Sequence, residues 1–162
     1  MIVKIKLLDE RAKLPNRAHY SDAGMDIVAV SRKITIDYFE YGTGISIAIP
    51  PNHAGFIFPR SSISKKNLNL CNAVGVIDSN YRGEIKIRFN ENHHSNTLNV
   101  YEVGDKVAQL IILPYPEISF LEVEDLDKTD RGSGGFGHSD NKFGLKLEEN
   151  ITPITRYNLS EL

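Results

Sequence analysis

The stretch Gly75-Val76-Ile77-Asp78-Ser79-Asn80-Tyr81-Arg82-Gly83-Glu84 is the most informative part of this chain. It begins with a short apolar run and continues with residues typical of turns, and residues 84–89 then alternate polar and apolar. This pattern predicts a β-hairpin. Because a hairpin holds its residues within narrow limits, Asp78 and Tyr81 are expected close together at its mouth. The first can accept a proton, and the second offers a flat aromatic face.

Short apolar segments separated by turn residues make up the rest of the chain as well. The segments that favour strands are residues 2–8, 27–30, 34–36, 45–49, 55–58, 73–77, 85–89, 97–101, 107–113 and 118–123. The best helical candidate is short, residues 61–66, with Ser61 or Ser62 as its N-cap. Many short strands with turns between them predict an all-β sandwich or barrel of the jelly-roll type, with one short helix.

The composition of the 162 residues, with 41% hydrophobic and 25% charged, is that of a soluble globular protein. The length suits one domain with a substantial core. The net charge of −2 argues against a protein that binds nucleic acid or a membrane surface. No apolar run approaches the roughly 20 residues that span a bilayer, and the N-terminus lacks the pattern of a signal peptide. Cys71 is the only cysteine, which excludes an internal disulfide and a cysteine zinc site. We therefore expect a cytosolic protein.

The composition changes at Arg131-Gly132-Ser133-Gly134-Gly135-Phe136-Gly137-His138-Ser139, which contains four glycines. Such a segment cannot hold a strand or helix by itself, and it is expected to be mobile until a ligand orders it. Its arginine can pair with phosphate, and its phenylalanine can stack on a base. The alternative is a flexible linker to residues 140–162. Alternation near residues 143–147 suggests a strand there that docks on another surface, such as a neighbouring subunit.

Three further segments carry polar residues that a core does not require. Asp22 and Asp26 flank a small-residue turn and can help to hold Mg²⁺ together with substrate phosphates, or can simply shape the turn. Arg60, with the two serines after it, forms a phosphate cradle or a simple N-cap. Asn72, which extends the opening segment upstream, offers the donors and acceptor that suit a pyrimidine edge or is a simple turn residue. Gln109 stands in an otherwise apolar strand and needs a hydrogen-bond partner if it is buried.

Taken in chain order, the five segments resemble the five motifs of one family, the homotrimeric all-β deoxyuridine triphosphatases (dUTP pyrophosphatases). The resemblance covers residues 2 to about 139. Its most specific parts are the third segment, Gly-x-Ile-Asp-x-x-Tyr-x-Gly, and the fifth, Arg-Gly-x-Gly-Gly-Phe-Gly. It implies a jelly-roll-like dUTPase fold in which residues 1–130 form the core. A mobile glycine-rich nucleotide-binding arm, residues 131–139, would follow, and then a C-terminal extension of unknown role, residues 140–162.

The same resemblance implies hydrolysis of dUTP to dUMP and diphosphate by attack of water on the α-phosphorus. That reaction limits uracil incorporation into DNA and supplies dUMP for dTMP synthesis. Asp78 would orient and deprotonate the water. Tyr81 would pack under the deoxyribose and leave no room for a 2′-hydroxyl. The uracil edge would be read by Asn72 and by the backbone of residues 72–78, including Val76 and Ile77.

The phosphates and the metal would be bound by the other segments. The residues expected near the phosphate chain are Arg60, Ser61, Ser62, Gln109 and, at the γ-phosphate, Arg131. Asp26 would contact Mg²⁺ through a bound water, and Lys86 would add a polar contact near the nucleotide. Phe136 would stack over the uracil as the arm closes, and Gly137 would also contact the substrate.

The implied partners are dUTP and further copies of the chain, since each site in this family draws on all three subunits of a homotrimer. No nucleic acid or membrane partner is expected. The location would be cytoplasmic, or the host cytosol or nucleus for a viral protein. Two alternatives remain open. A dCTP deaminase or bifunctional deaminase–dUTPase shares the fold but needs a glutamate in the hairpin region. A dUTPase-fold regulatory or binding protein would instead use its surface to contact a partner.

Overall fold

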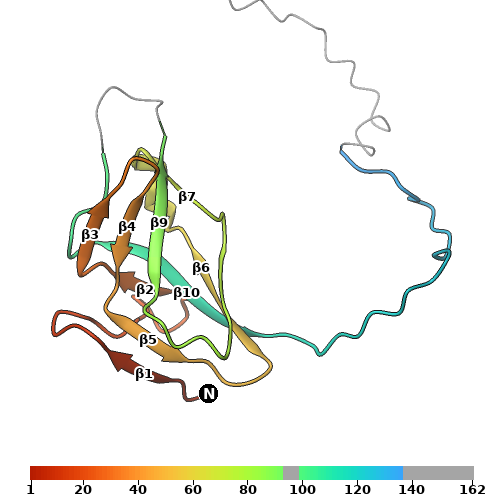
Figure 1. Ribbon diagram of the computed structural model, residues 1–162, viewed down its shortest axis with the longest axis horizontal. Helices are drawn as coiled ribbons and strands as arrows, with labels where there is room; N and C mark the ends of the chain where they lie inside the picture. The colour runs from red at the N-terminus through yellow and green to blue at the C-terminus, as the bar shows by residue number, and fades with distance from the viewer. Residues whose placement is uncertain (93–98, 137–162) are drawn as a thin grey trace, which may run out of the picture. The chain divides into compact units, whose positions relative to one another are not determined.

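The computed structural model describes residues 1–92 and 99–136 (Figure 1). The chain divides into two compact units, Met1–Ser119 and Phe120–Leu162. All strands found among the described residues belong to the first unit. The predicted limits of the core, the arm and the extension stay predictions, and residues 137–162 lie outside the described residues.

Within the described residues, the first unit is built from three antiparallel sheets. One has the strand order β2-β10-β6-β8 and contains Met25–Val28, Lys106–Pro114, His53–Phe58 and Gly75–Ile77. The second has the order β3-β4-β9-β7 and contains Ser31–Ile34, Phe39–Gly42, Lys86–Glu91 and Leu68–Leu70. The third pairs β1 (Lys4–Leu7) with β5 (Ile45–Ala48). The predicted all-β fold is therefore confirmed, and Figure 1 shows the labelled strands.

The hydrophobic core combines side chains from both four-stranded sheets and from β5. Tyr41 of β4 and Phe89 of β9 are fully buried and pack edge to face, with ring centroids 5.8 Å apart. Tyr101, in the loop before β10, adds a third ring to this cluster. Because buried aromatic rings contribute large apolar areas, the cluster fixes the loop before β10 against the second sheet.

Three predicted strands were wrong or only partly testable. Residues 34–36 overlap β3 only at Ile34, because the chain turns at Thr35, whose N–H donates to the carbonyl of Tyr38. Residues 118–123 form no strand, because their side chains find no partner strand among the described residues, and Phe120 is 96% exposed. Of residues 97–101, only 99–101 are described, and these are not in a strand. The sequence also did not predict β4 and β7. Gly42 and the polar residues around Leu68 resemble turn residues. In the structure, β4 is paired on both sides, by β3 and β9, and β7 is an edge strand paired with β9.

The short helix expected over residues 61–66 is a 3₁₀ helix, η1, at Ser61–Lys65. The N-cap prediction was wrong, because the cap is Arg60 in an extended conformation and no side chain caps it among the described residues. Both serines therefore lie inside the first turn, where their hydroxyls are not used for capping. Along the described parts of the chain, we find no helix with the length and apolar character needed to cross a membrane.

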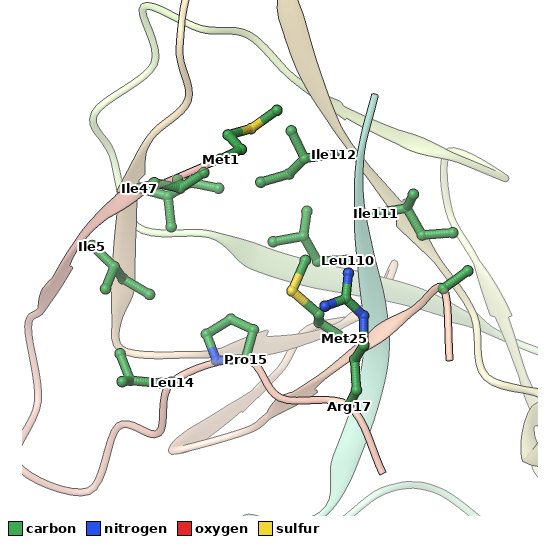
Figure 2. A pocket seen from close by; sticks show the side chains of 12 residues that line it. Met1, Ile5, Leu14, Pro15, Arg17, Met25, Ile47, Leu110, Ile111 and Ile112 are labelled. Carbon is green, nitrogen blue, oxygen red and sulfur yellow. The ribbon is translucent and has the colours of Figure 1, made fainter. Parts of the chain in front are cut away.

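A cavity of about 500 Å³ lies between the β1–β5 pair and strands β2 and β10 (Figure 2). Its lining is apolar apart from Arg17, and the side chains around it come from Ile5 of β1, Met25 of β2, Ile47 of β5 and Leu110 of β10. None of the predicted site residues lines it. The candidate site is therefore elsewhere.

Candidate active site

The segment 75–89 is not the hairpin that its pattern predicts. Strand β8 pairs with β6, whereas β9 pairs with β4 and β7 in the other four-stranded sheet. Alternation identifies a strand and its faces but not its partner, which is why the hairpin prediction was wrong. Residues 78–85 form a crossing loop between the two sheets.

The crossing loop still brings the predicted base and ring together. The N–H of Tyr81 donates to the carbonyl of Asp78 at 3.1 Å, which closes a tight turn. The phenol of Tyr81 donates to the carbonyl of Glu84 at 3.0 Å. A Cβ at Gly83 would overlap the Tyr81 phenol, so only glycine lets the ring lie against the backbone here. The ring is thus held in place, although it is 44% exposed.

Hydrogen bonds fasten the same loop to the body of the protein. The guanidinium of Arg82 donates to the carbonyls of Ser79 and Tyr81 at 2.7 and 2.8 Å. The hydroxyl of Ser46, a buried residue of β5, donates to the carbonyl of Arg82 at 2.7 Å. The carboxylate of Glu84 accepts the N–H of Gly44 at 2.9 Å. Asp78 is therefore presented by a fixed loop and not by a loose one.

Two adjoining cavities border this loop. One, of about 280 Å³, brings together the predicted residues Val76, Ile77, Asp78, Tyr81 and Lys86. The other, of about 330 Å³, is lined by Asn72 and again by Val76, Ile77 and Lys86. Six of the predicted site residues thus surround neighbouring spaces, which are large enough together for a nucleoside.

Lys86 belongs to a small charged network beside these cavities. Its ammonium lies 3.3 Å from the carboxylate of Glu40 and 3.9 Å from that of Glu84, and Arg88 pairs with Glu40 at 2.7 Å. Burial raises the pKa of Glu40, but the hydrogen bonds from Arg88 and Lys86 outweigh burial and hold it below its usual range. The two ion pairs hold the Lys86 ammonium in position on β9.

A second cluster assembles the predicted phosphate and metal residues. The two carboxylate oxygens of Asp26 bind the guanidinium of Arg60 at 2.9 Å and the ammonium of Lys106 at 2.8 Å. Burial raises the pKa of Asp26, but the hydrogen bonds from Lys106 and Arg60 hold it below its usual range. Arg60 also donates to the hydroxyl of Ser62 at 3.4 Å, while Ser61 opens η1 and is exposed. The result is a cationic cluster ordered around one carboxylate.

Gln109 lies next to this cluster on β10, paired with Asp26 across the sheet. Its amide donates to the carbonyl of Pro59 at 3.1 Å, which meets the hydrogen-bonding need expected of a polar residue in an apolar strand. A Cβ at Gly24 would overlap the Gln109 side chain, so the glycine makes room for it. Asp22 accepts the N–H of His19 at 2.9 Å and shapes the preceding turn.

Sequence reasoning missed Lys106. The residue precedes an apolar strand within Gly104-Asp105-Lys106, where it resembles an ordinary turn residue. Its role depends on the pairing of β10 with β2, which brings its ammonium to Asp26. No signal within one segment reveals such a contact, because it joins positions 80 residues apart in the chain.

The two clusters lie toward opposite ends of the β2-β10-β6-β8 sheet. Ile77 pairs with Gly55 near the start of β6, so Asp78 continues past that end of the strand. Arg60 continues past the other end, beyond Phe58, which pairs with Gln109. In this antiparallel register, Asp78 lies opposite residue 54 of β6. Arg60 lies six residues further along that chain segment, so at ~3.3 Å per residue the two are about 20 Å apart along the strand direction.

The predicted arm residues belong to the second unit. The guanidinium of Arg131 donates to the carbonyl of Gly134 at 2.8 Å, and the side chain of Phe136 is fully exposed. Gly137 lies outside the described residues.

The comparisons with known proteins agree with one another. A family model described as dUTPase matches residues 10–140. The deoxyuridine 5′-triphosphate nucleotidohydrolase of Idiomarina loihiensis is 43% identical over 148 residues, covering 85% of this chain and 96% of that protein. The protein of the same name from Clostridium tetani is 45% identical over 139 residues, covering 83% of this chain and 94% of that protein.

Solved structures show the same fold. The dUTPase of Staphylococcus bacteriophage 80alpha with dUpNHpp matches with a TM-score of 0.72 and 25% identity, and the match covers 85% of this chain and 97% of the phage protein. A variant dUTPase from phage phi11 of S. aureus, described for its coordination of a structural Mg(II) ion, has a TM-score of 0.66 and 26% identity, covering 77% and 98%. The family match spans the crossing loop, the cationic cluster and all of the glycine-rich segment 131–139. The chain belongs to the dUTPase family.

Proposed function

We propose that this chain hydrolyses dUTP to dUMP and diphosphate, with Asp78 as the general base that activates the water. The observation that carries the proposal is the turn that joins Asp78 to Tyr81 beside a shared cavity. A carboxylate in reach of bound water can supply about 10²–10⁴-fold in rate by taking the proton as the water attacks the α-phosphorus.

The nucleoside would occupy the two cavities beside the crossing loop. Tyr81 is held against Gly83, so its ring cannot retreat to admit a 2′-hydroxyl, and UTP is excluded by steric overlap. Asn72 and the backbone of Val76 and Ile77 supply hydrogen-bonding groups for the uracil edge. Lys86 adds a cation at the border of both cavities.

The phosphate chain would bind at Arg60, Ser61, Ser62 and Gln109, with Lys106 added by the geometry. Arg60 and Lys106 are held in place by Asp26, so little ordering remains to be done when the anion arrives. A guanidinium and an ammonium at fixed positions stabilise negative charge that develops on phosphate oxygens. In the arm, Arg131 would bind the γ-phosphate, and Phe136 and Gly137 would cover the uracil.

Asp26 suits an indirect contact with Mg²⁺. Both of its oxygens are engaged in ion pairs, and among the described residues no group of three or more Asp, Glu, His or Cys side chains is placed to hold a metal ion directly. Mg²⁺ usually keeps several waters and binds through one or two carboxylates plus substrate phosphates. We therefore expect Asp26 to reach the ion through water. When bound with the substrate, the ion would neutralise phosphate charge.

The separation of the two clusters supports active sites that are shared between copies, as in the homotrimer that the family resemblance implies. The attacked phosphorus has to be near both the base and the phosphate-binding cations, yet one chain sets them about 20 Å apart along the sheet. Asp78 of one copy and Arg60 of another would then complete one site, and cyclic symmetry closes such an arrangement. Exposed apolar residues in 118–126 offer further surface for contact between copies.

The deaminase alternative is not favoured. The family match and the named relatives are dUTPases. Glu84, the glutamate on the crossing loop, is engaged by the N–H of Gly44 and by Lys86, which gives it a structural role. A cytoplasmic location is proposed because the substrate is a cellular nucleotide and a chain with one cysteine needs no oxidising compartment.

A substrate panel tests the proposed function. With Mg²⁺, the purified chain should release diphosphate from dUTP, and kcat/KM for UTP and dCTP should be lower by at least about a hundredfold. Product analysis distinguishes the alternatives, since ammonia released from dCTP would identify a deaminase. Binding of dUTP without turnover would instead favour a binding protein.

A further inference from the structure

One buried polar atom in the first unit has no explanation in the fold. Among the residues that the structure describes, the Tyr101 hydroxyl is the one buried side-chain nitrogen or oxygen without a hydrogen-bond partner. Tyr101 is 2% exposed, so the hydroxyl is shielded from bulk solvent. Because an unpaired buried hydroxyl weakens a fold, such a group calls for a reason.

The Tyr101 ring is fixed, so its hydroxyl oxygen cannot move toward a more distant partner. The ring packs against Tyr41 and Phe89, with centroids 6.1 and 5.6 Å away. The ammonium of Lys66 lies 5.0 Å from the ring centroid. The carbonyl of Tyr101 accepts hydrogen bonds from the Tyr41 hydroxyl at 2.9 Å and from Arg32 at 3.0 Å. A hydrogen bond to the Tyr101 hydroxyl therefore requires that another group move toward it.

The available partner is Ser62. Tyr101 lines a cavity of about 480 Å³ together with Ser62 and the cations Arg60, Lys66 and Lys106. Burial raises the pKa of Tyr101, which keeps the phenol in its neutral, donating form, while the neighbouring Ser62 hydroxyl and Arg60 guanidinium act in the opposite direction. The Ser62 hydroxyl thus lies close enough to act on the phenol, although no hydrogen bond of good geometry joins the two in the free protein.

We propose that Tyr101 is a positioning residue for the dUTPase reaction, whose hydroxyl donates to the Ser62 hydroxyl when the phosphate chain binds in the adjoining cavity. The inference rests on the proposed placement of the phosphates at Arg60 and Ser62. A serine hydroxyl has one proton and two acceptor sites. Arg60 already donates to one of these sites at 3.4 Å. If Tyr101 fills the other, the Ser62 proton can point only into the cavity, at a phosphate oxygen.

The test compares two buried tyrosines in the full-length chain. Tyr101→Phe should raise KM for dUTP by about three- to tenfold, the effect of one hydrogen bond, and leave kcat within about twofold. Its melting temperature should not fall, since the lost hydroxyl has no partner in the free protein. The matched control is Tyr41→Phe, which loses a bond to a carbonyl in the core and should lower the melting temperature by about 3 °C with KM unchanged.

A double-mutant cycle with Ser62→Ala separates the possible failures. If Tyr101 acts through Ser62, the double variant should have the KM of Ser62→Ala alone. Additive effects would overturn the inference, as would an unchanged KM or a lower melting temperature for Tyr101→Phe. If Ser62→Ala itself leaves KM unchanged, the proposed phosphate placement fails first. If the parent chain does not hydrolyse dUTP at all, the proposed function fails.

Discussion

Asp26 and Asp78 lie toward opposite ends of one sheet and have opposite surroundings. Asp26 is 14% exposed and holds Arg60 and Lys106 with its two oxygens. Asp78 is exposed, and among the described residues its carboxylate has no ion pair or hydrogen bond. A general base needs a free lone pair for a water proton, whereas a phosphate-binding cluster needs cations fixed in advance. The fold thus preorganises the cations and leaves the base open.

The largest effect should come from removing the open carboxylate. Asp78→Asn should lower kcat by about 10²–10⁴-fold, because an amide cannot take the proton of the attacking water. Affinity for the non-hydrolysable analogue dUpNHpp should stay within a few-fold, since the amide keeps the size of the side chain. Single-turnover rates and calorimetric binding measure the two effects.

Asp22→Asn is the matched control for this substitution. Asp22 accepts the N–H of His19 in a turn, and an asparagine oxygen can do the same, so activity should be unchanged. Turnover of Asp78→Asn within about tenfold of the parent would assign the base to another residue.

Subunit mixing tests whether the two ends of the sheet work in different copies. Asp78→Asn and Arg60→Ala should each be nearly inactive alone. Random assembly of equal amounts should restore about a quarter of the parent activity, because about a quarter of sites would pair an intact base with an intact cluster from a neighbour. If both parts of a site came from one chain, every site would carry one defect and the mixture would stay inactive. Co-expression with two affinity tags checks that mixed assemblies have formed.

The sequence predicted individual parts of this arrangement better than their connections. Alternation and turn residues located β5, β6 and β10 and singled out Asp78 and Tyr81. They could not show that β8 and β9 belong to different sheets, because the pattern within a strand does not identify its partner. For the same reason, Lys106 was missed and the Tyr101 hydroxyl could not be foreseen. Both depend on contacts between segments far apart in the chain.

The smallest effect should come from Asp26, whose ion pairs contribute to the free energy of unfolding. The pKa of Asp26 is lowered in the folded state. Its ion pairs therefore contribute fully to stability at pH values above the ordinary aspartate pKa of about 3.9. That contribution is lost as the pH falls through the folded-state pKa. Asp26→Asn should therefore cost about 1–2 kcal/mol at pH 7, and the difference from the parent should shrink in acid.

Urea unfolding at a series of pH values measures this difference. The control is Asp9→Asn, which removes a similar pair with Arg11 at the surface, where solvent screens it. A cost for Asp26→Asn that does not change with pH would show that packing and not charge accounts for it.

The crossing loop has a consequence for how the protein loses activity on heating. The loop follows β8, in which Gly75 is buried, and it ends at Ile85, which is also buried. The carbonyls of Arg82 and Ile85 accept hydrogen bonds from the hydroxyls of Ser46 and Thr43. The base therefore has little freedom to loosen while the sheets stay together. Inactivation and global unfolding should follow one time course, so the residual activity of a heated sample would report the fraction of molecules that remain folded.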